Sequence, residues 1–482
     1  MLFNSIDFAI FLPVVFFIYW FVVNKNTRYQ NLFIVIASYF FYGWIDPKFL
    51  SLIIFSTIVD FAIGKKLATT ESPKSRKQLL YLSLFVNLGF LLFFKYFNFF
   101  ADNFVQAFSL FGRELNPLTL KILLPVGISF YTFQTLSYTI DVYRRNLEPT
   151  KDFISFAAYV SFFPQLVAGP IERATNLLPQ FLKKRTFSYE AAIDGSCQIL
   201  WGLVKKLIIA DNCAIYANEI FNNSDAYPGS VLLLGALFFT FQIYGDFSGY
   251  SDIAIGTARL FGFNLMQNFA TPYFSRDIAE FWRRWHISLS TWFRDYLYIP
   301  LGGSRGGEWM KLRNTFAIFL VSGFWHGANW TYIVWGGLNA IYFLPLLLRK
   351  KNRRNLDVVA QGKLLPSPRE VYQMATTFIL TVLAWIFFRA DNVSHAINIL
   401  SEIFSKTIIS KPQFVGIKDA GFHCIIIFLF LLAEWFGRDK QYAIESLKNT
   451  TSTKRVFVFF LIIVALAMFM ATEASEFIYF QF

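Results

Sequence analysis

Long apolar runs recur from one end of this chain to the other, and they constrain its fold more than any other feature. Hydrophobic residues make up 55% of the 482 residues and charged residues only 16%, whereas a soluble domain is about a quarter charged. Many of the runs are long enough to cross a bilayer as a helix. We therefore predict an all-α, polytopic membrane protein. Its candidate spans or buried helices lie near 7–23, 31–45, 49–63, 79–97, 122–141, 153–169, 231–244, 247–262, 315–325, 330–348, 371–388, 423–436 and 456–472.

The formal net charge is +13, which in a soluble protein would suggest nucleic acid as a partner. Here the basic residues fall in loops between the apolar runs, as expected for loops that stay in the cytoplasm, and we expect no nucleic-acid partner. The amino terminus lacks the basic region and cleavage site of a signal peptide, so it is predicted to be a retained first span that begins outside. The three cysteines form no CxxC or Cys/His pattern, so we expect no metal site and no permanently bound cofactor.

Two segments have basic loops on both sides, and a single crossing would place one of those loops on the wrong side of the membrane. The first is 153–169, where PQLVAGP (164–170) carries helix-breaking Pro and Gly. It is either a re-entrant segment, satisfied by protein or a water-filled cavity, or a miscounted span. The second is 315–348, which is predicted to be a helical hairpin with both ends inside.

One histidine, His326, falls near the turn of that hairpin, within FLVSGFWHGANW (319–330). An ionisable group at membrane depth is costly, so it indicates a functional site by default. A neutral imidazole there can remove a proton from a hydroxyl as the hydroxyl attacks a thioester. The alternative is a hydrogen-bonded core histidine. Trp325 and Asn329 flank His326 and are candidate donor- or acceptor-binding residues.

A second candidate lies in 276–300, where the spacing predicts one amphipathic helix resting in the cytoplasmic interface. An aromatic face carries Trp282, Trp285, Leu289, Trp292, Phe293 and Tyr296, and the opposite face carries Arg276, Arg283, Ser290 and Arg294. The arginines either hold an anionic acyl carrier, such as phosphopantetheine or the nucleotide of coenzyme A, or follow the positive-inside rule. His286 lies between the two faces and is either a second active-site group or an interfacial histidine.

The segment 241–256 places three glycines on one helical face, which allows another helix to approach closely. Asp246 and Asp252 lie in the same apolar region. Either carboxylate orients a histidine or pairs with a buried arginine, or the two belong to a purely structural polar pair. His395 and His423 fall near external helix ends and are expected to have no polar side chains beside them.

These motifs together resemble the membrane-bound O-acyltransferase family, and within it the alginate O-acetyltransferase-like proteins. The matching stretches include FFPQLVAGPIER (162–173), FQIYGDFSGYSDIAIG (241–256), a long stretch over 268–303 and FLVSGFWHGANWTYIVWGGLNA (319–340). The opening FNSIDFAIFLP and the closing EFIYFQF (476–482) are also similar, so the likeness covers essentially the whole chain.

The resemblance implies a single membrane-embedded domain over 1–482, built as a ring of about 11–12 transmembrane helices with re-entrant and interfacial helices around a thin centre. It assigns His326 as the catalytic histidine and His286 as the second histidine. The implied reaction moves an acetyl group from a cytoplasmic thioester, acetyl-CoA or another acyl thioester, toward an extracytoplasmic polysaccharide at the bacterial inner membrane. A separate periplasmic or surface acetyltransferase is the implied partner.

Two other functions stay open at this stage. A sister branch of the family transfers D-alanine to teichoic acid from an acyl-carrier protein docked at the cytoplasmic face. A transporter or flippase for a lipid-linked saccharide would also suit the aromatic richness and the broken helices, although we find no internal repeat, which many transporters have.

Overall fold

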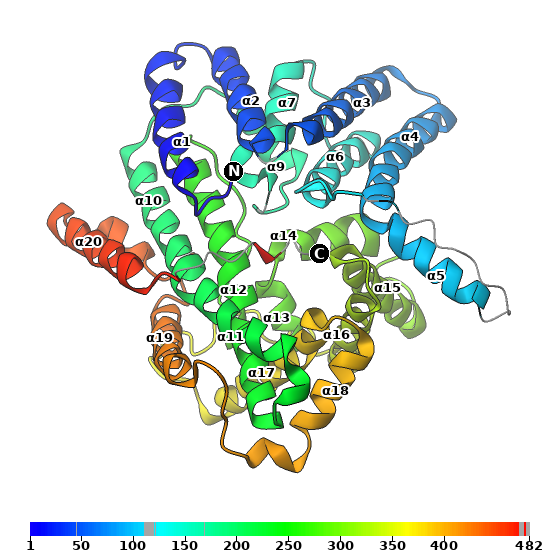
Figure 1. The fold of residues 1–482 in the computed structure, drawn as a ribbon. Coiled ribbons are helices and arrows are strands. Elements are labelled where there is room, and N and C mark those ends of the chain that lie inside the picture. The colour runs from blue at the N-terminus through cyan, green and yellow to red at the C-terminus, as the bar shows by residue number, and fades with distance from the viewer. Residues whose placement is uncertain (45, 110–119, 121, 168, 472–476, 479–482) are drawn as a thin grey trace. The chain divides into compact units, whose positions relative to one another are not determined.

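The computed structural model describes residues 1–44, 46–109, 120, 122–167, 169–471 and 477–478. Within these residues every regular element is helical, and no strand is present (Figure 1). The described chain forms two compact units, one made of 1–192 with 257–266 and the other of 193–256 with 267–482. Most of the closing EFIYFQF motif lies outside the described residues. The predicted all-α class is confirmed.

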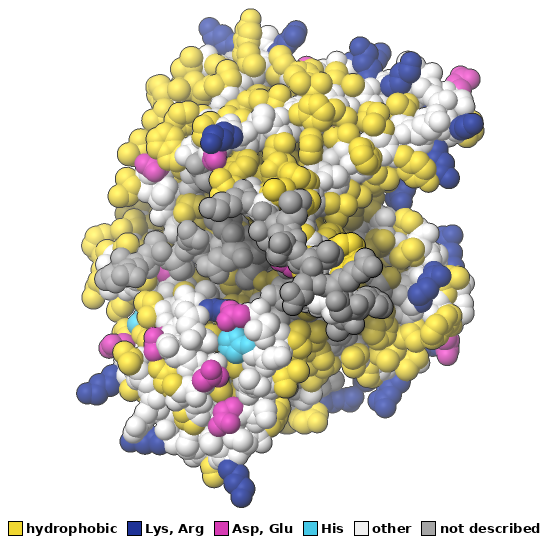
Figure 2. Space-filling model, turned by 45° about the vertical axis from the view of Figure 1, so that its right-hand side comes forward, with side chains coloured by type: hydrophobic (Ala, Val, Ile, Leu, Met, Phe, Trp, Pro, Cys, Tyr) yellow, Lys and Arg dark blue, Asp and Glu magenta, His cyan; other side chains and the backbone are white. Residues whose placement is uncertain are grey.

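Seven helices of the described chain are long and apolar enough to cross a membrane. They are Pro47–Thr69, Pro73–Ser109, Gly229–Leu260, Trp330–Leu348, Pro368–Arg389, Ile417–Phe436 and Ser452–Phe469. Many large hydrophobic side chains are exposed, and Figure 2 shows them covering much of the visible face. Such a surface suits contact with lipid rather than water, so the chain is a multi-pass membrane protein. The count of 11–12 spans and the ring arrangement stay predictions.

In the first unit, α2 (Thr27–Gly43), α3 (Leu50–Thr69) and α6 (Ile128–Tyr143) pack against the short α7 (Phe153–Ser161), and α4 (Pro73–Leu91) packs against α3 and α6. α7 has 9 residues, about 14 Å of helix, which is too short to cross a bilayer alone. After it come α8 (Phe163–Leu166) and α9 (Ala174–Leu182). The segment 153–169 is therefore broken twice, first at Phe162, which precedes PQLVAGP, and again after Leu166, within that motif. Its re-entrant course stays a prediction. The unit also contains α1 (Ile6–Phe17) and α5 (Phe97–Ser109).

The two predicted spans 231–244 and 247–262 are instead one continuous helix, α12, which has 32 residues from Gly229 to Leu260. Its glycines do not break it because they sit against a neighbouring backbone. A Cβ atom at Gly249 would lie 2.8 Å from the Gly202 carbonyl oxygen, and one at Gly245 would lie 2.8 Å from the Lys205 oxygen. These residues belong to α10 (Tyr189–Leu203) and to the π-helix η4 (Val204–Ala210). The close contact predicted from the glycine spacing is present.

The helices α10, η4 and α11 (Asp211–Asn222) were not among the predicted spans. Two consecutive lysines, Lys205 and Lys206, interrupt the apolar pattern there. Both are buried, at 4% and 0% exposed. The hydropathy pattern missed these helices because it counts a lysine as exposed and cannot count the carboxylates that neutralise it.

α15 (Glu308–His326) and α16 (Trp330–Leu348) form an antiparallel hairpin over the range 315–348, and α17 (Pro368–Arg389) packs beside α16 (Figure 1). The hairpin helices touch through their backbones. A Cβ atom at Gly323 would collide with the Tyr332 carbonyl, and one at Gly336 with the Phe319 carbonyl. The rest of this unit includes α18 (Val393–Ile403), α19 (Ile417–Phe436) and α20 (Ser452–Phe469).

We predict that Gly336→Ala destabilises the protein by roughly 1–3 kcal/mol, because the added methyl group must push α16 away from α15. The neighbouring Gly337 is the matched control, since a Cβ atom there would lie 3.9 Å from the Leu320 side chain. Thermal unfolding of both variants in detergent is the measurement. Equal unfolding midpoints for the two variants would contradict this description of the hairpin.

Candidate active site

His326 is the last residue of α15 and is 3% exposed. Its ring lies edge-on to Trp335 of α16, with ring centroids 5.1 Å apart, and to Phe388 of α17 at 5.2 Å. The Trp325 ring lies 4.9 Å away. Three helices thus supply an aromatic enclosure around one imidazole. Aromatic rings hold a neighbouring group by shape and exclude water, so the orientation of this histidine is closely restricted.

The segment 276–300 is not the single amphipathic helix that its spacing predicts. It forms α13 (Ile278–Arg284), α14 (Ile287–Phe293) and the π-helix η7 (Arg294–Tyr298). His286 separates the first two, with a left-handed φ of 44°. The break is stabilised by Asn268, whose carbonyl oxygen accepts from the Ile287 N–H at 2.9 Å and whose side-chain oxygen accepts from the Ser288 N–H at 3.2 Å. Capping by a distant residue is invisible to helical periodicity.

The two candidate histidines are brought into one neighbourhood by Trp325. Ring centroids of His286 and Trp325 lie 6.1 Å apart, and those of Trp325 and His326 lie 4.9 Å apart. His286 is 1% exposed and also packs edge-on against Phe247 of α12 at 4.6 Å. Burial lowers the pKa of His286 to about 3. Its imidazole is therefore neutral throughout the physiological pH range.

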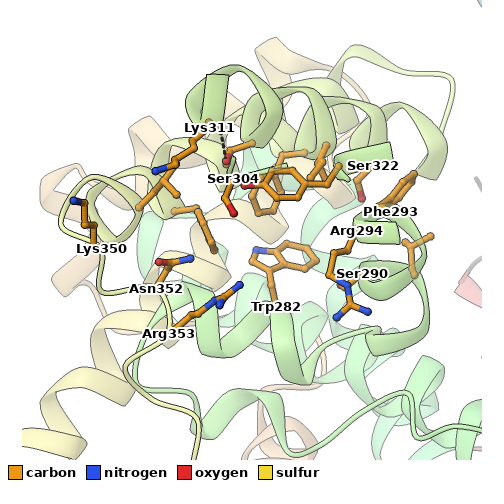
Figure 3. A pocket seen from close by; sticks show the side chains of 17 residues that line it. Trp282, Ser290, Phe293, Arg294, Ser304, Lys311, Ser322, Lys350, Asn352 and Arg353 are labelled. Atoms are coloured by element: carbon orange, nitrogen blue, oxygen red, sulfur yellow. Dashed lines mark hydrogen bonds between the residues drawn. The ribbon is translucent and has the colours of Figure 1, made fainter. Parts of the chain in front are cut away.

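A cavity of about 380 Å³ lies beside the hairpin; we call it the basic cavity. It is lined by Trp282, Leu289, Ser290, Phe293, Arg294, Tyr298, Ser304, Lys311, Thr315, Ile318, Phe319, Ser322, Phe343, Leu347, Lys350, Asn352 and Arg353. Four of these residues are basic and none of them is acidic. Figure 3 shows the Trp282 ring in the middle, with Lys350, Asn352 and Arg353 to one side and Ser290, Arg294 and Ser322 to the other.

The basic cavity follows one face of α15, the helix that ends at His326. Lys311, Thr315, Ile318, Phe319 and Ser322 lie on one face of the helix, since residues three or four apart share a face. His326 follows Ser322 by four residues, about 6 Å along the axis. The Trp282 ring in the cavity wall also contacts Trp335 at 5.6 Å, and Trp335 contacts His326. The cavity and the histidine are therefore neighbours on the same element.

The predicted binding residues have different positions. Ser290 and Arg294 line the basic cavity. The Arg283 guanidinium instead donates to the carbonyl oxygens of Asn352 at 2.8 Å and Asn355 at 2.7 Å, and so binds the segment that follows α16. Asn329 caps α16 and donates to the Asp391 carbonyl oxygen at 2.8 Å, which makes it a structural residue of the turn after His326.

Asp246 and Asp252 do not orient either histidine. Asp246 pairs with Lys206 at 2.7 Å, and Asp252 pairs with Lys205 at 3.0 Å. Lys206 also contacts Asp211 at 2.8 Å, and Lys205 contacts Glu434 of α19 at 3.3 Å. Of the alternatives left open by the sequence, the structural polar pair is the one present, with lysines rather than an arginine as the partners. The consecutive lysines in an otherwise apolar stretch were the signal that sequence reasoning missed.

His395 and His423 each lie within hydrogen-bond distance of a hydroxyl group, contrary to the prediction. His395 Nε2 lies 3.0 Å from the Ser224 hydroxyl, and His423 Nδ1 lies 2.9 Å from the Tyr216 hydroxyl. Each contact joins two segments far apart in the sequence, which no local pattern reveals. In the described chain neither histidine belongs to a cluster of metal-ligating side chains.

Comparison with known proteins identifies the family. The sequence model of the membrane-bound O-acyltransferase (MBOAT) family matches residues 144–363, a range that contains both histidines and the basic cavity. A probable alginate O-acetylase of Pseudomonas putida is 38% identical over 506 residues, covering 100% of both chains. The chain belongs to the MBOAT family.

Two further relatives extend the comparison. The peptidoglycan O-acetyltransferase of Helicobacter pylori is 36% identical, covering 83% of this chain and 79% of the relative. The teichoic acid D-alanyltransferase of Bacillus subtilis is 30% identical over a smaller part, 45% of this chain and 57% of the relative. This MBOAT protein is an O-acyltransferase, as predicted.

We predict that Lys206→Met lowers the stability of this MBOAT protein by roughly 3–5 kcal/mol, because it removes the ammonium group that balances the charge of the buried Asp211 and Asp246 carboxylates. The control is Lys440→Met, which removes a half-exposed lysine that pairs with Asp439. Unfolding midpoints in detergent and the amount of protein in the membrane are the measurements. If both variants behave like the parent protein, the buried pairs do not hold α12 against η4.

Proposed function

We propose that this protein is a membrane-bound O-acetyltransferase that moves an acetyl group from a cytoplasmic thioester toward an extracytoplasmic polysaccharide. The observation that carries the proposal is the arrangement along α15. The basic cavity lines one end of a helical face, and His326 lies at the other end of the same face.

The basic cavity suits a phosphorylated thioester donor such as acetyl-CoA. Lys311, Lys350 and Arg353 supply positive charge for phosphate groups, whereas the Arg294 guanidinium already pairs with Asp295 at 2.7 Å. Ile318, Phe319 and Phe343 supply an apolar wall for the pantetheine arm. The Trp282 indole N–H is buried and has no acceptor within the described chain. It is placed to donate to an amide or thioester carbonyl of the donor. A carrier protein bearing phosphopantetheine is the alternative donor.

The chemistry assigned to His326 is general base catalysis. Its neutral imidazole takes the proton of an acceptor hydroxyl as the oxygen bonds to the acetyl carbonyl carbon. The carbon–sulfur bond of the thioester breaks, and the proton passes from the imidazolium to the departing thiolate. His286, on the other side of Trp325, positions the donor or the acceptor.

The direction of transfer follows from charge. The chain after α16 carries Arg349, Lys350, Lys351, Arg353 and Arg354, and basic loops remain in the cytoplasm. The donor end of the cavity is then cytoplasmic, and a bacterial inner membrane is the expected location. The acceptor hydroxyl belongs to the polysaccharide or to a periplasmic or surface acetyltransferase that completes the transfer. The full-length similarity to a probable alginate O-acetylase supports acetyl over D-alanyl transfer.

We predict that His326→Ala reduces acetylation of the surface glycan by at least about 100-fold, because general base catalysis contributes at least that much. The amount of the variant in the membrane should equal that of the parent protein. His423→Ala, which removes a histidine far from the basic cavity in sequence, is the control and should retain activity. Normal acetyl content with His326→Ala would remove the catalytic role.

We predict that the double variant Lys350→Glu/Arg353→Glu raises the KM for acetyl-CoA by roughly tenfold or more with little change in kcat, because it replaces attraction for phosphate by repulsion. Lys351→Glu/Arg354→Glu is the matched control. It makes the same change of net charge in the same loop at residues that do not line the cavity. Acetyl release from labelled acetyl-CoA by membrane vesicles is the measurement, and equal KM values for the two variants would rule out this donor site.

A further inference from the structure

We propose that Asn268 is a positioning residue that fixes His286 in the tautomer with hydrogen on Nδ1, which leaves the Nε2 lone pair to accept a hydrogen bond or proton from the substrate. This inference rests on the proposed function, because it concerns how His286 serves the same site. The inference goes beyond the proposed function by naming the residue that sets the tautomer of His286 and the atom through which His286 acts.

The first step is the orientation of the Asn268 amide. Its Oδ1 atom lies 3.2 Å from the Ser288 backbone nitrogen, which carries a hydrogen and only donates. Its Nδ2 atom lies 3.0 Å from the Ser251 hydroxyl oxygen, which accepts from it. A flipped amide would set an N–H against the Ser288 N–H. The side-chain oxygen of Asn268 therefore faces His286.

The second step is the position of the imidazole hydrogen. His286 Nδ1 lies 3.1 Å from Asn268 Oδ1. An amide oxygen only accepts, so the contact is favourable only when Nδ1 carries the hydrogen. The Ser288 hydroxyl also donates to Oδ1, at 2.9 Å, and is farther from Nδ1, at 3.4 Å. A neutral imidazole carries one ring hydrogen, so Nε2 has a lone pair.

The third step concerns the surroundings of Nε2. This atom is buried and has no hydrogen-bond partner within the described chain. The rings that contact His286 are Phe247, Phe269 and Trp325, and none of them is ionisable. A buried polar atom without a partner is destabilising, and such atoms are retained where a ligand supplies the missing partner. The Trp325 ring contacts both imidazoles, so His286 lies in the neighbourhood of the histidine proposed as the base.

The choice of an amide rather than a carboxylate has a chemical consequence. A carboxylate on Nδ1 would stabilise the imidazolium and raise the pKa of His286. Asn268 fixes the same tautomer without adding charge, and burial alone lowers the pKa of His286 to about 3. The ring then stays a neutral acceptor at every pH at which the enzyme works. Asn268 is itself 0% exposed, so it is held rigidly by its own neighbours.

The experiment compares four variants in membrane vesicles with acetyl-CoA, each normalised to the parent protein at the same pH. Asn268→Leu removes the acceptor and should reduce the rate about tenfold or more at all pH values. Asn268→Asp keeps an acceptor and should act nearly normally at pH 8. In this variant the aspartate raises the pKa of His286, by roughly 3 at most for a neighbouring carboxylate. Nε2 is then protonated as the pH falls, and the rate of Asn268→Asp should be about tenfold lower at pH 5 than at pH 8.

Two further variants separate this role from simple support of the fold. Ser288→Ala removes a hydroxyl but keeps the backbone donor to Asn268, and it should stay within about threefold of the parent rate. Asn212→Leu removes another buried amide, which binds the Leu207, Ile208 and Phe469 carbonyls. It should affect protein amount rather than the shape of the pH profile. An Asn268→Asp profile parallel to that of the parent would overturn the proposal.

Nitrogen-15 spectra of histidine-labelled protein test the tautomer directly, and the chain has only 4 histidines. His286→Gln identifies the His286 signals by their loss. Protonated Nδ1 and unprotonated Nε2 between pH 5 and pH 8 are expected, and hydrogen on Nε2 would overturn the proposal. If His286→Gln is fully active, the function proposed for His286 fails. If it is inactive while Asn268→Leu is fully active with the parent's tautomer, only the role of Asn268 fails.

Discussion

The backbone contact between α15 and α16 is the constraint on which the candidate site depends. Gly323 and Gly336 let the two helices approach until each meets the other's carbonyl groups. This approach brings Trp335 against His326 and places α17 behind them, so that Phe388 covers the same ring. A wider hairpin would leave a space beside His326 that water or lipid could fill. The packing of three helices therefore restricts the orientation of the imidazole.

A second constraint acts within the same unit, where two lysines and four carboxylates are buried. Each lysine lies between two carboxylates, so each group of three carries about one net negative charge. The Tyr244 hydroxyl and the Ile478 N–H donate to two of these carboxylates, which spreads that charge over further polar groups. Buried ion pairs add little stability over apolar packing but are costly to break. They therefore fix which residues of η4, α12 and α19 meet, and with them the position of Phe247 against His286.

Sequence patterns predicted the all-α class, the hairpin that turns after His326 and the glycine face of α12, because each depends on residues close together in the chain. They failed where a distant residue decides the local structure. Helical spacing over 276–300 predicts one helix, but Asn268 caps α14 and allows the left-handed turn at His286.

Hydropathy likewise missed 189–222, since the carboxylates that neutralise Lys205 and Lys206 include residues of α12 and α19. Arg283 was a candidate either for ligand binding or for the positive-inside rule. Its guanidinium donates to the Asn352 and Asn355 carbonyl oxygens, contacts that composition alone cannot reveal.

The polarity of the α15 face accounts for the direction in which a thioester donor would lie. Its first turns carry Lys311, with Lys350 and Arg353 across the basic cavity, and its later turns carry Ile318, Phe319 and Ser322. Phosphate groups are strongly favoured at the basic end and cannot be solvated at the apolar end. An extended pantetheine arm must then run toward the carboxyl end of the helix. There His286, which burial keeps neutral, adds no positive charge that would attract phosphate, so under the proposed function charge alone selects the orientation of the donor.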